Sequence, residues 1–198
     1  MLWIIFISIM IGLLAGFIGW IPSGIHPYFD HLITYGVCLL VFSVGVNIGR
    51  NREVWHQMKV LGARVLLLPA GVVAGTLLGS LVVPLFIPIG LREALAVGAG
   101  FGWYSLSGVL LMKLHSAELG ALAFLTNLFR ELLSFLIIPL LARYTGPFTM
   151  IAPGGATTMD TTLPLISRFS NANGAILAFI NGFLLSILVP ILLPLFID

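Results

Sequence analysis

Charged residues and cysteine are scarce in this chain of 198 residues. Only 8% of the residues are charged, against about 25% in soluble domains, and 60% are hydrophobic. The single cysteine, Cys38, excludes an intrachain disulfide framework and a cysteine-based metal cluster. Nucleotide-binding fingerprints are also missing, since the alternating Gly98, Gly100 and Gly102 lack the strand that such a motif follows. We therefore predict a polytopic membrane protein that is not an enzyme, needs no cofactor and binds no nucleic acid.

Long apolar runs occupy most of the sequence. A helix needs roughly 20 apolar residues to cross a bilayer, and the runs of about this length are residues 2–20, 31–48, 60–84, 119–142 and 173–196. The first run has neither a basic start nor a small-residue cleavage site, so we interpret it as a span rather than as a signal peptide. From Gly71 to Gly79 glycine recurs at every fourth position, a spacing that lets helix backbones approach closely.

Two further apolar segments, residues 91–114 and 148–167, are interrupted by glycine-rich breaks. The first break reads GFGWYSLSG at 100–108, and the second reads PGGATTMDTT at 153–162. A shift of 54 residues aligns Gly100 with Gly154, Gly120 with Gly174, Ala121 with Ala175, Asn127 with Asn181 and Phe129 with Phe183. Each unit is therefore a broken segment followed by a long helix, and paired breaks of this kind point to the binding site of a transporter.

Each broken segment either crosses the membrane or enters and returns as a re-entrant hairpin. Hairpins would leave about five full spans and would invert the second unit relative to the first, whereas crossings would give seven spans, two of them discontinuous. Inverted repeats are common in transporters, so we favour hairpins. In both arrangements most basic loop residues fall on the side of Arg50, and the positive-inside rule then places the N-terminus in the cytoplasm and the C-terminus outside.

The expected fold is accordingly an all-α polytopic membrane protein with one transporter domain over residues 1–198. Residues 1–90 would form a three-span scaffold, and residues 91–198 would form the two repeats.

The helix predicted at 119–142 carries charges in its middle. Asn127, Arg130, Glu131 and Ser134 follow one another at i, i+3, i+4 and i+7, which puts them on one helical stripe. A charge at mid-membrane costs on the order of 3 kcal/mol on insertion scales, so the stripe must face protein or water. One interpretation is a structural Arg130–Glu131 pair between helices. The interpretation that we favour is a charged site on a transport path.

Asp160 is a second acid within an apolar segment, and it lies in the second break. Hydroxyls from four threonines could bind its carboxylate, together with backbone N–H groups freed by the break: Thr157, Thr158, Thr161 and Thr162. Unwound backbone is tolerated at membrane depth where it is buried in protein or lines a cavity. Asp160 could also cap a helix that begins at Thr161, and the two roles are compatible.

Further candidate site residues are aromatic or uncharged. Trp103, Tyr104 and Ser105 in the first break could bind the stem or the cationic head of a substrate, or the aromatic pair could anchor the chain at the membrane interface. Asn127 and Asn181 would lie at related positions near the midplane. They would serve either the binding site or hydrogen bonds between helices.

The charges of the predicted site favour a cationic substrate. Glu131, Asp160 and Arg130 sum to a formal charge of −1. A basic amino acid would place its ammonium groups against the acids and its carboxylate against Arg130 or the N-terminus of a half-helix. Because hydrocarbon surroundings favour the protonated form of a carboxylate, one acid could carry a proton in one direction and the substrate in the other.

Three segments of the chain resemble the signature of the bacterial lysine exporters of the LysO type: residues 100–108, residues 127–131 (NLFRE) and residues 155–164 (GATTMDTTLP). Residues 42–50 and 182–190 are also similar to that family. The resemblance implies a multi-pass exporter in the bacterial plasma membrane that moves lysine and toxic lysine analogues, driven by an ion gradient such as protons, by alternating access. The two intramembrane acids that the family needs for transport match Glu131 and Asp160.

Longer members of that family carry an additional N-terminal block of spans. The resemblance therefore implies that this chain works with a small three-span partner subunit or as a homodimer. Two other functions stay open on the sequence. One is an antiporter of similar architecture for sodium or another cation, and the other is a channel or a non-transporting subunit of a larger assembly.

Overall fold

The computed structural model describes residues 62–197 continuously and, before them, the isolated positions 7, 11, 14, 15, 17, 18, 28, 31, 32, 35, 36, 38, 39, 42, 46 and 50. The continuous stretch belongs to one compact unit. The spans predicted at 2–20 and 31–48, and the basic loop that follows them, lie largely outside the described residues. The predicted division into a three-span scaffold and two repeats therefore stays a prediction.

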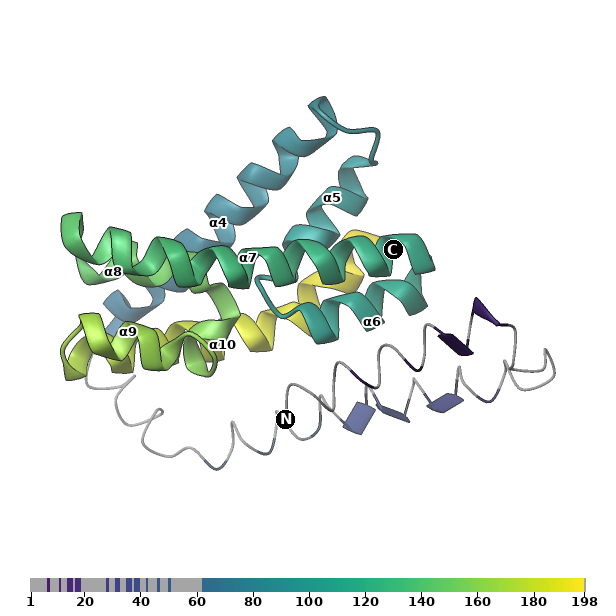
Figure 1. Ribbon diagram of the computed structural model, residues 1–198. Helices are drawn as coiled ribbons and strands as arrows, with labels where there is room; N and C mark the ends of the chain where they lie inside the picture. The colour runs from purple at the N-terminus through teal and green to yellow at the C-terminus, as the bar shows by residue number, and fades with distance from the viewer. Residues whose placement is uncertain are drawn as a thin grey trace. The chain divides into compact units, whose positions relative to one another are not determined.

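Every element described between residues 62 and 197 is a helix (Figure 1). The α-helices are α4 (Leu67–Val82), α5 (Leu91–Gly98), α6 (Tyr104–Leu114), α7 (Ala117–Tyr144), α8 (Pro147–Ile151), α9 (Leu163–Phe169) and α10 (Ala172–Ile197). Three 3-10 helices accompany them: η2 (Gly62–Leu66), η3 (Val83–Leu85) and η4 (Ala152–Met159).

Three of the described helical stretches are long and apolar enough to cross a membrane: Leu67–Leu85, Ala117–Tyr144 and Asn173–Ile197. They confirm the runs predicted at 60–84, 119–142 and 173–196. On the outer face of α7, Phe129, Leu132 and Leu136 are more than half exposed, as expected for side chains that contact lipid. The chain is therefore an all-helical, multi-pass membrane protein within the part that the structure describes.

Local signals set the ends of α7. The hydroxyl of Ser116 caps the helix by accepting a hydrogen bond from the N–H of Leu119 at 3.2 Å. Glu118 lies in the first turn and Arg143 in the last, and both charges complement the helix dipole. The sequence predicts that another helix backbone approaches α4 closely along Gly71, Gly75 and Gly79. No described residue does so, because none has an atom within 4 Å of a Cβ added at these glycines.

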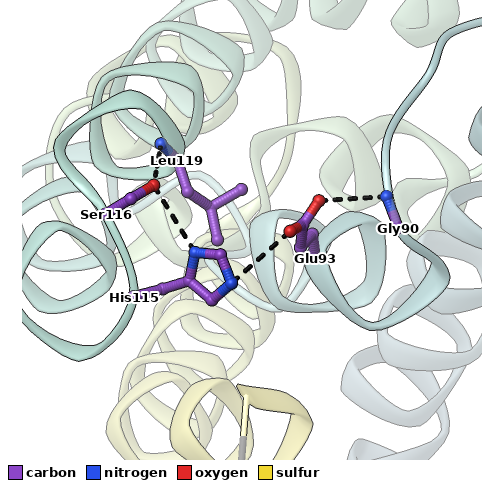
Figure 2. Close-up of polar contacts among 5 residues, drawn as sticks. All are labelled: Gly90, Glu93, His115, Ser116 and Leu119. Carbon is purple, nitrogen blue, oxygen red and sulfur yellow. Dashed lines mark hydrogen bonds and ion pairs between the residues drawn. The ribbon is translucent and has the colours of Figure 1, made fainter.

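The first broken segment consists of α5 and α6, and a polar cluster joins its two outer ends (Figure 2). Glu93, in the first turn of α5, accepts a hydrogen bond from the N–H of Gly90 at 2.9 Å. Its other carboxylate oxygen lies 3.4 Å from Nε2 of His115, which directly follows α6. Nδ1 of His115 lies 3.4 Å from the capping hydroxyl of Ser116. The start of α5, the end of α6 and the start of α7 therefore meet at one place.

The second broken segment consists of α8, η4 and α9. Figure 1 shows α6 alongside the first half of α7, and α8 and α9 alongside its second half. The inner ends of the two segments meet, because the N–H of Ala156 donates a hydrogen bond to the carbonyl of Phe101 at 2.8 Å. Close approach of the two breaks requires glycine at 155, where φ is +60° and an added Cβ would collide with the Phe101 carbonyl.

Candidate functional site

A cavity of about 500 Å³ lies where the two breaks meet α7 and α10. Volumes of this size are typical of small-molecule sites. Four parts of the chain line it: the first break with the start of α6 (Gly102, Trp103, Tyr104, Ser105), α7 (Glu131), the second break (Ala156, Thr157, Met159, Asp160, Thr161) and α10 (Phe179, Phe183, Ser186).

The structure brings most of the predicted site residues to this cavity: Glu131, Asp160, Trp103, Tyr104, Ser105, Thr157 and Thr161. The remaining ones, Arg130, Asn127, Thr158 and Asn181, are not among its lining residues. The side chains of these four hold the backbone of the breaks instead, through the hydrogen bonds described below.

The two acids share the cavity but differ in exposure. Glu131 is only 7% exposed, and its Oε2 is buried without a hydrogen-bond partner among the described residues. Asp160 is exposed to the cavity, and its Oδ1 accepts a hydrogen bond from the N–H of Thr161 at 2.6 Å and lies 3.4 Å from the Thr161 hydroxyl. Two carboxylates that line one cavity repel one another when both are charged. A cation between them would relieve that repulsion.

Arg130 points away from the cavity. Its Nε donates to the carbonyl of Pro153 at 3.2 Å, and its Nη1 donates to the hydroxyl of Thr76 on α4 at 3.1 Å. No ion pair with Glu131 is present in the described stretch. Among the described residues, the cavity lining therefore contains two acids and no basic residue, so the predicted charge of −1, which counted Arg130, does not describe the lining. The guanidinium instead joins the second break to α4.

Asn127 and Asn181, the pair aligned by the shift of 54 residues, each hold the break of their own unit. Oδ1 of Asn127 accepts the N–H of Gly102 at 2.7 Å, and its Nδ2 donates to the carbonyl of Val97 at 3.1 Å. Nδ2 of Asn181 donates to the carbonyl of Gly155 and to the hydroxyl of Thr158, both at 3.1 Å. These are the hydrogen bonds between segments that the sequence offered as one of two roles for the pair.

One hydrogen bond differs between the units. The residue that corresponds to Gly102 in the second unit is Ala156, whose N–H donates to Phe101 rather than to Asn181. Oδ1 of Asn181 is buried and has no partner among the described residues. The second unit therefore contains a spare acceptor where the first unit has a satisfied one.

The threonines order the second break more than they bind Asp160. The hydroxyls of Thr157 and Thr158 donate to the carbonyls of Gly154 and Gly155, each at 2.8 Å. Asp160 does not have the helix-capping role that the sequence left open as an alternative, because α9 begins at Leu163 and Thr162 occupies its N-cap position. The carboxylate of Asp160 is therefore held by Thr161 alone among the four threonines.

The first break ends at the N-terminus of α6. Trp103 is the N-cap residue, Tyr104 and Ser105 begin the first turn, and no side chain of the described residues caps this end. The ring of Tyr104 packs edge-on against Phe124 of α7, with ring centroids 5.3 Å apart. Trp103 and Tyr104 both line the cavity. Their role as an anchor at the membrane interface stays a second prediction.

Little in the sequence distinguishes the residues that α10 contributes to the lining. Phe179, Phe183 and Ser186 recur at helical spacing on one face of α10. In a long hydrophobic run such as α10, side chains of these types are usually explained by packing against other helices. The one signal was the alignment of Phe129 with Phe183, which placed Phe183 in the second unit but did not give its direction.

The sequence of this chain is similar to proteins that are described as lysine exporters. Residues 6–197 match the family described as "Lysine exporter LysO". A lysine exporter LysO from Escherichia coli (strain K12) is 38% identical over 162 residues, which are 82% of this chain and 54% of the relative. A protein described as a putative lysine exporter from Haemophilus influenzae is 32% identical over 193 residues, 96% of this chain and 94% of the relative. The chain thus spans about half the length of the Escherichia coli relative. No solved structure matches the chain.

Proposed function

Because the chain belongs to the lysine exporter LysO family, we propose that it is a secondary active exporter of L-lysine and toxic lysine analogues. The observation that carries the proposal is that Glu131 and Asp160 line one cavity, where none of the described lining residues is basic. Charged side chains at membrane depth are costly and mark substrate or ion paths. Two carboxylates match the two ammonium groups of lysine.

The chemistry of the cavity also supports exchange for protons. A carboxylate shielded from water favours its protonated form, and lysine can bind only after the acids have lost their protons. Binding of lysine from the cytoplasm would release protons from Glu131 or Asp160. Release of lysine on the other side would let protons return to the acids. Each cycle then moves lysine outward and protons inward.

We propose that both broken segments are re-entrant hairpins whose inner ends meet at the cavity. The contact between Glu93 and His115 supports this arrangement for the first segment, because a segment that crossed the membrane would hold its ends far apart. The hydrogen bond between Phe101 and Ala156 supports a meeting of the two inner ends. Hairpins entering from opposite faces fit an inverted repeat with alternating access, an N-terminus in the cytoplasm and a C-terminus outside.

The proposed location is the bacterial inner membrane. The proposed assembly is either a homodimer or a complex with a small three-span subunit. The Escherichia coli relative is about twice as long as the matched part of this chain, which supports testing both forms.

Reconstitution into liposomes tests the proposal. Vesicles loaded with labelled lysine should release it when the purified chain is present, and lysine release should drive protons into the vesicles, measured with an enclosed pH-sensitive dye. Protein-free vesicles are the control. A pH change driven by sodium without any need for lysine would favour an antiporter of another cation. A conductance that follows voltage without lysine exchange would favour a channel.

A further inference from the structure

Residues that line the cavity carry both a buried acceptor and N–H donors that have no partner among the described residues. The acceptor is Oε2 of Glu131. The donors are N–H groups in the first turn of α6, an 11-residue helix whose beginning lines the cavity through Tyr104 and Ser105. A molecule that carries both an ammonium and a carboxylate would satisfy the two sets together.

Two backbone N–H groups in the first turn of α6 have no acceptor among the described residues. The N–H of Tyr104 bonds to the carbonyl of Gly102 at 3.1 Å, and the N–H of Ser107 bonds to the carbonyl of Trp103 at 3.0 Å. Between them, the N–H groups of Ser105 and Leu106 donate to no described residue. The carbonyl of Phe101, one turn earlier, is taken by Ala156.

The charged side chains of the cavity do not fill this position. Asp160 uses its Oδ1 to bind Thr161, and no described residue donates a hydrogen bond to Oε2 of Glu131. Arg130, which directly precedes Glu131, donates its hydrogen bonds to Pro153 and Thr76, and neither of these residues lines the cavity. The first turn of α6 is therefore the candidate anion-binding group beside the cavity, because unpaired N–H groups and the helix dipole both favour negative charge there.

We propose that the first turn of α6 binds the α-carboxylate of the substrate, while Glu131 and Asp160 bind its ammonium groups. The inference rests on the proposed function and adds a specificity to it: the site requires an amino acid and rejects the corresponding diamine. A diamine would satisfy the acids but would leave the N–H groups of α6 without a partner, and a site built to bind a polar group discriminates strongly against a ligand that lacks it.

The first test needs no variant. Vesicles containing the full chain exchange labelled lysine against unlabelled lysine, lysinamide or 1,5-diaminopentane, and the concentration for half-inhibition is measured for each. Lysine should compete at least about tenfold better than either ligand without a carboxylate. Equal competition by 1,5-diaminopentane would overturn the inference while leaving lysine export in place. If the chain exchanges no lysine at all, the proposed function fails, and the inference fails with it.

A pair of variants then assigns the effect to the backbone. Ser105→Pro removes one free N–H in the first turn, where that N–H has no intrahelical acceptor, and Ser105→Ala keeps that N–H while removing the hydroxyl. The preference for lysine over 1,5-diaminopentane should fall several-fold in Ser105→Pro and should be preserved in Ser105→Ala, whatever each does to the overall rate. The same preference in both variants would overturn the assignment to α6.

Discussion

The backbone carbonyl of Phe101 accepts a hydrogen bond from the backbone N–H of Ala156 at 2.8 Å. This bond joins two breaks that lie more than 50 residues apart in the sequence. Phe101 is buried and has a φ of +46°, a backbone conformation that residues other than glycine adopt at some cost. The surrounding contacts therefore hold the first break in a strained shape that presents its carbonyl to the second break.

Removing either acid should abolish lysine export. Glu131→Gln and Asp160→Asn keep the size of each side chain but remove the charge that binds an ammonium group. Lysine efflux from vesicles should fall to the level of protein-free vesicles, while membrane insertion stays normal. Glu118→Gln is the matched control, because Glu118 is an exposed acid at the start of α7 away from the cavity. Normal efflux in Glu131→Gln or Asp160→Asn would remove that residue from the site.

Arg130→Lys should lower the stability of the protein. Lysine keeps the charge but offers one ammonium group, which cannot reproduce the separate contacts of Nε with Pro153 and of Nη1 with Thr76. Loss of one hydrogen bond to a charged group costs about 1.5–3 kcal/mol, so thermal unfolding in detergent should begin at a lower temperature. Arg143→Lys, at an exposed position of the same helix, should change little. An unchanged unfolding temperature combined with weaker lysine binding would instead place Arg130 in the binding site.

Gly155→Ala should separate the two breaks. Alanine at a φ of +60° is strained, and its Cβ would collide with the carbonyl of Phe101 and crowd Arg130. We expect loss of transport and a lower unfolding temperature. Gly146→Ala provides the control, since Gly146 has an ordinary φ of −79° and no described atom within 4 Å of an added Cβ. Equal behaviour of the two variants would show that close contact of the breaks is not needed.

Cysteine labelling tests the hairpins. With Cys38 replaced by serine, single cysteines at exposed positions 92 and 118 flank the first broken segment, and those at 143 and 168 flank the second. A membrane-impermeant maleimide applied from one side should label 92 and 118 together, and from the other side 143 and 168 together. Labelling of 92 and 118 from opposite sides would mean that the first segment crosses the membrane.

Much of the fold follows from the sequence because long apolar runs have few alternatives in a membrane. The helices α7 and α10 and the inward-facing stripe of Asn127, Glu131 and Ser134 were predictable in this way, and all three of these side chains are buried. The direction of Arg130 was not predictable. Neighbouring residues on a helix point about 100° apart, so Arg130 and Glu131 face different partners, and spacing alone does not say which of them faces the cavity.

Other parts of the site depend on contacts that no local pattern encodes. Asp160 does not cap α9, which was one of the two roles that the sequence left open, because the second break continues through Thr162 and α9 begins at Leu163. Phe179, Phe183 and Ser186 carry no charge, so only the packing of α10 against the second break reveals that they line the cavity.

The spare acceptor on Asn181 has a consequence for movement. A buried N–H left without a partner costs about 1–3 kcal/mol, and this cost would oppose any separation of the breaks at Phe101. The position of Asn181 corresponds to that of Asn127, which accepts the equivalent N–H in the first unit. In a state in which the breaks had parted, Oδ1 of Asn181 would be the acceptor for the amide of Ala156 that corresponds to Oδ1 of Asn127 for Gly102.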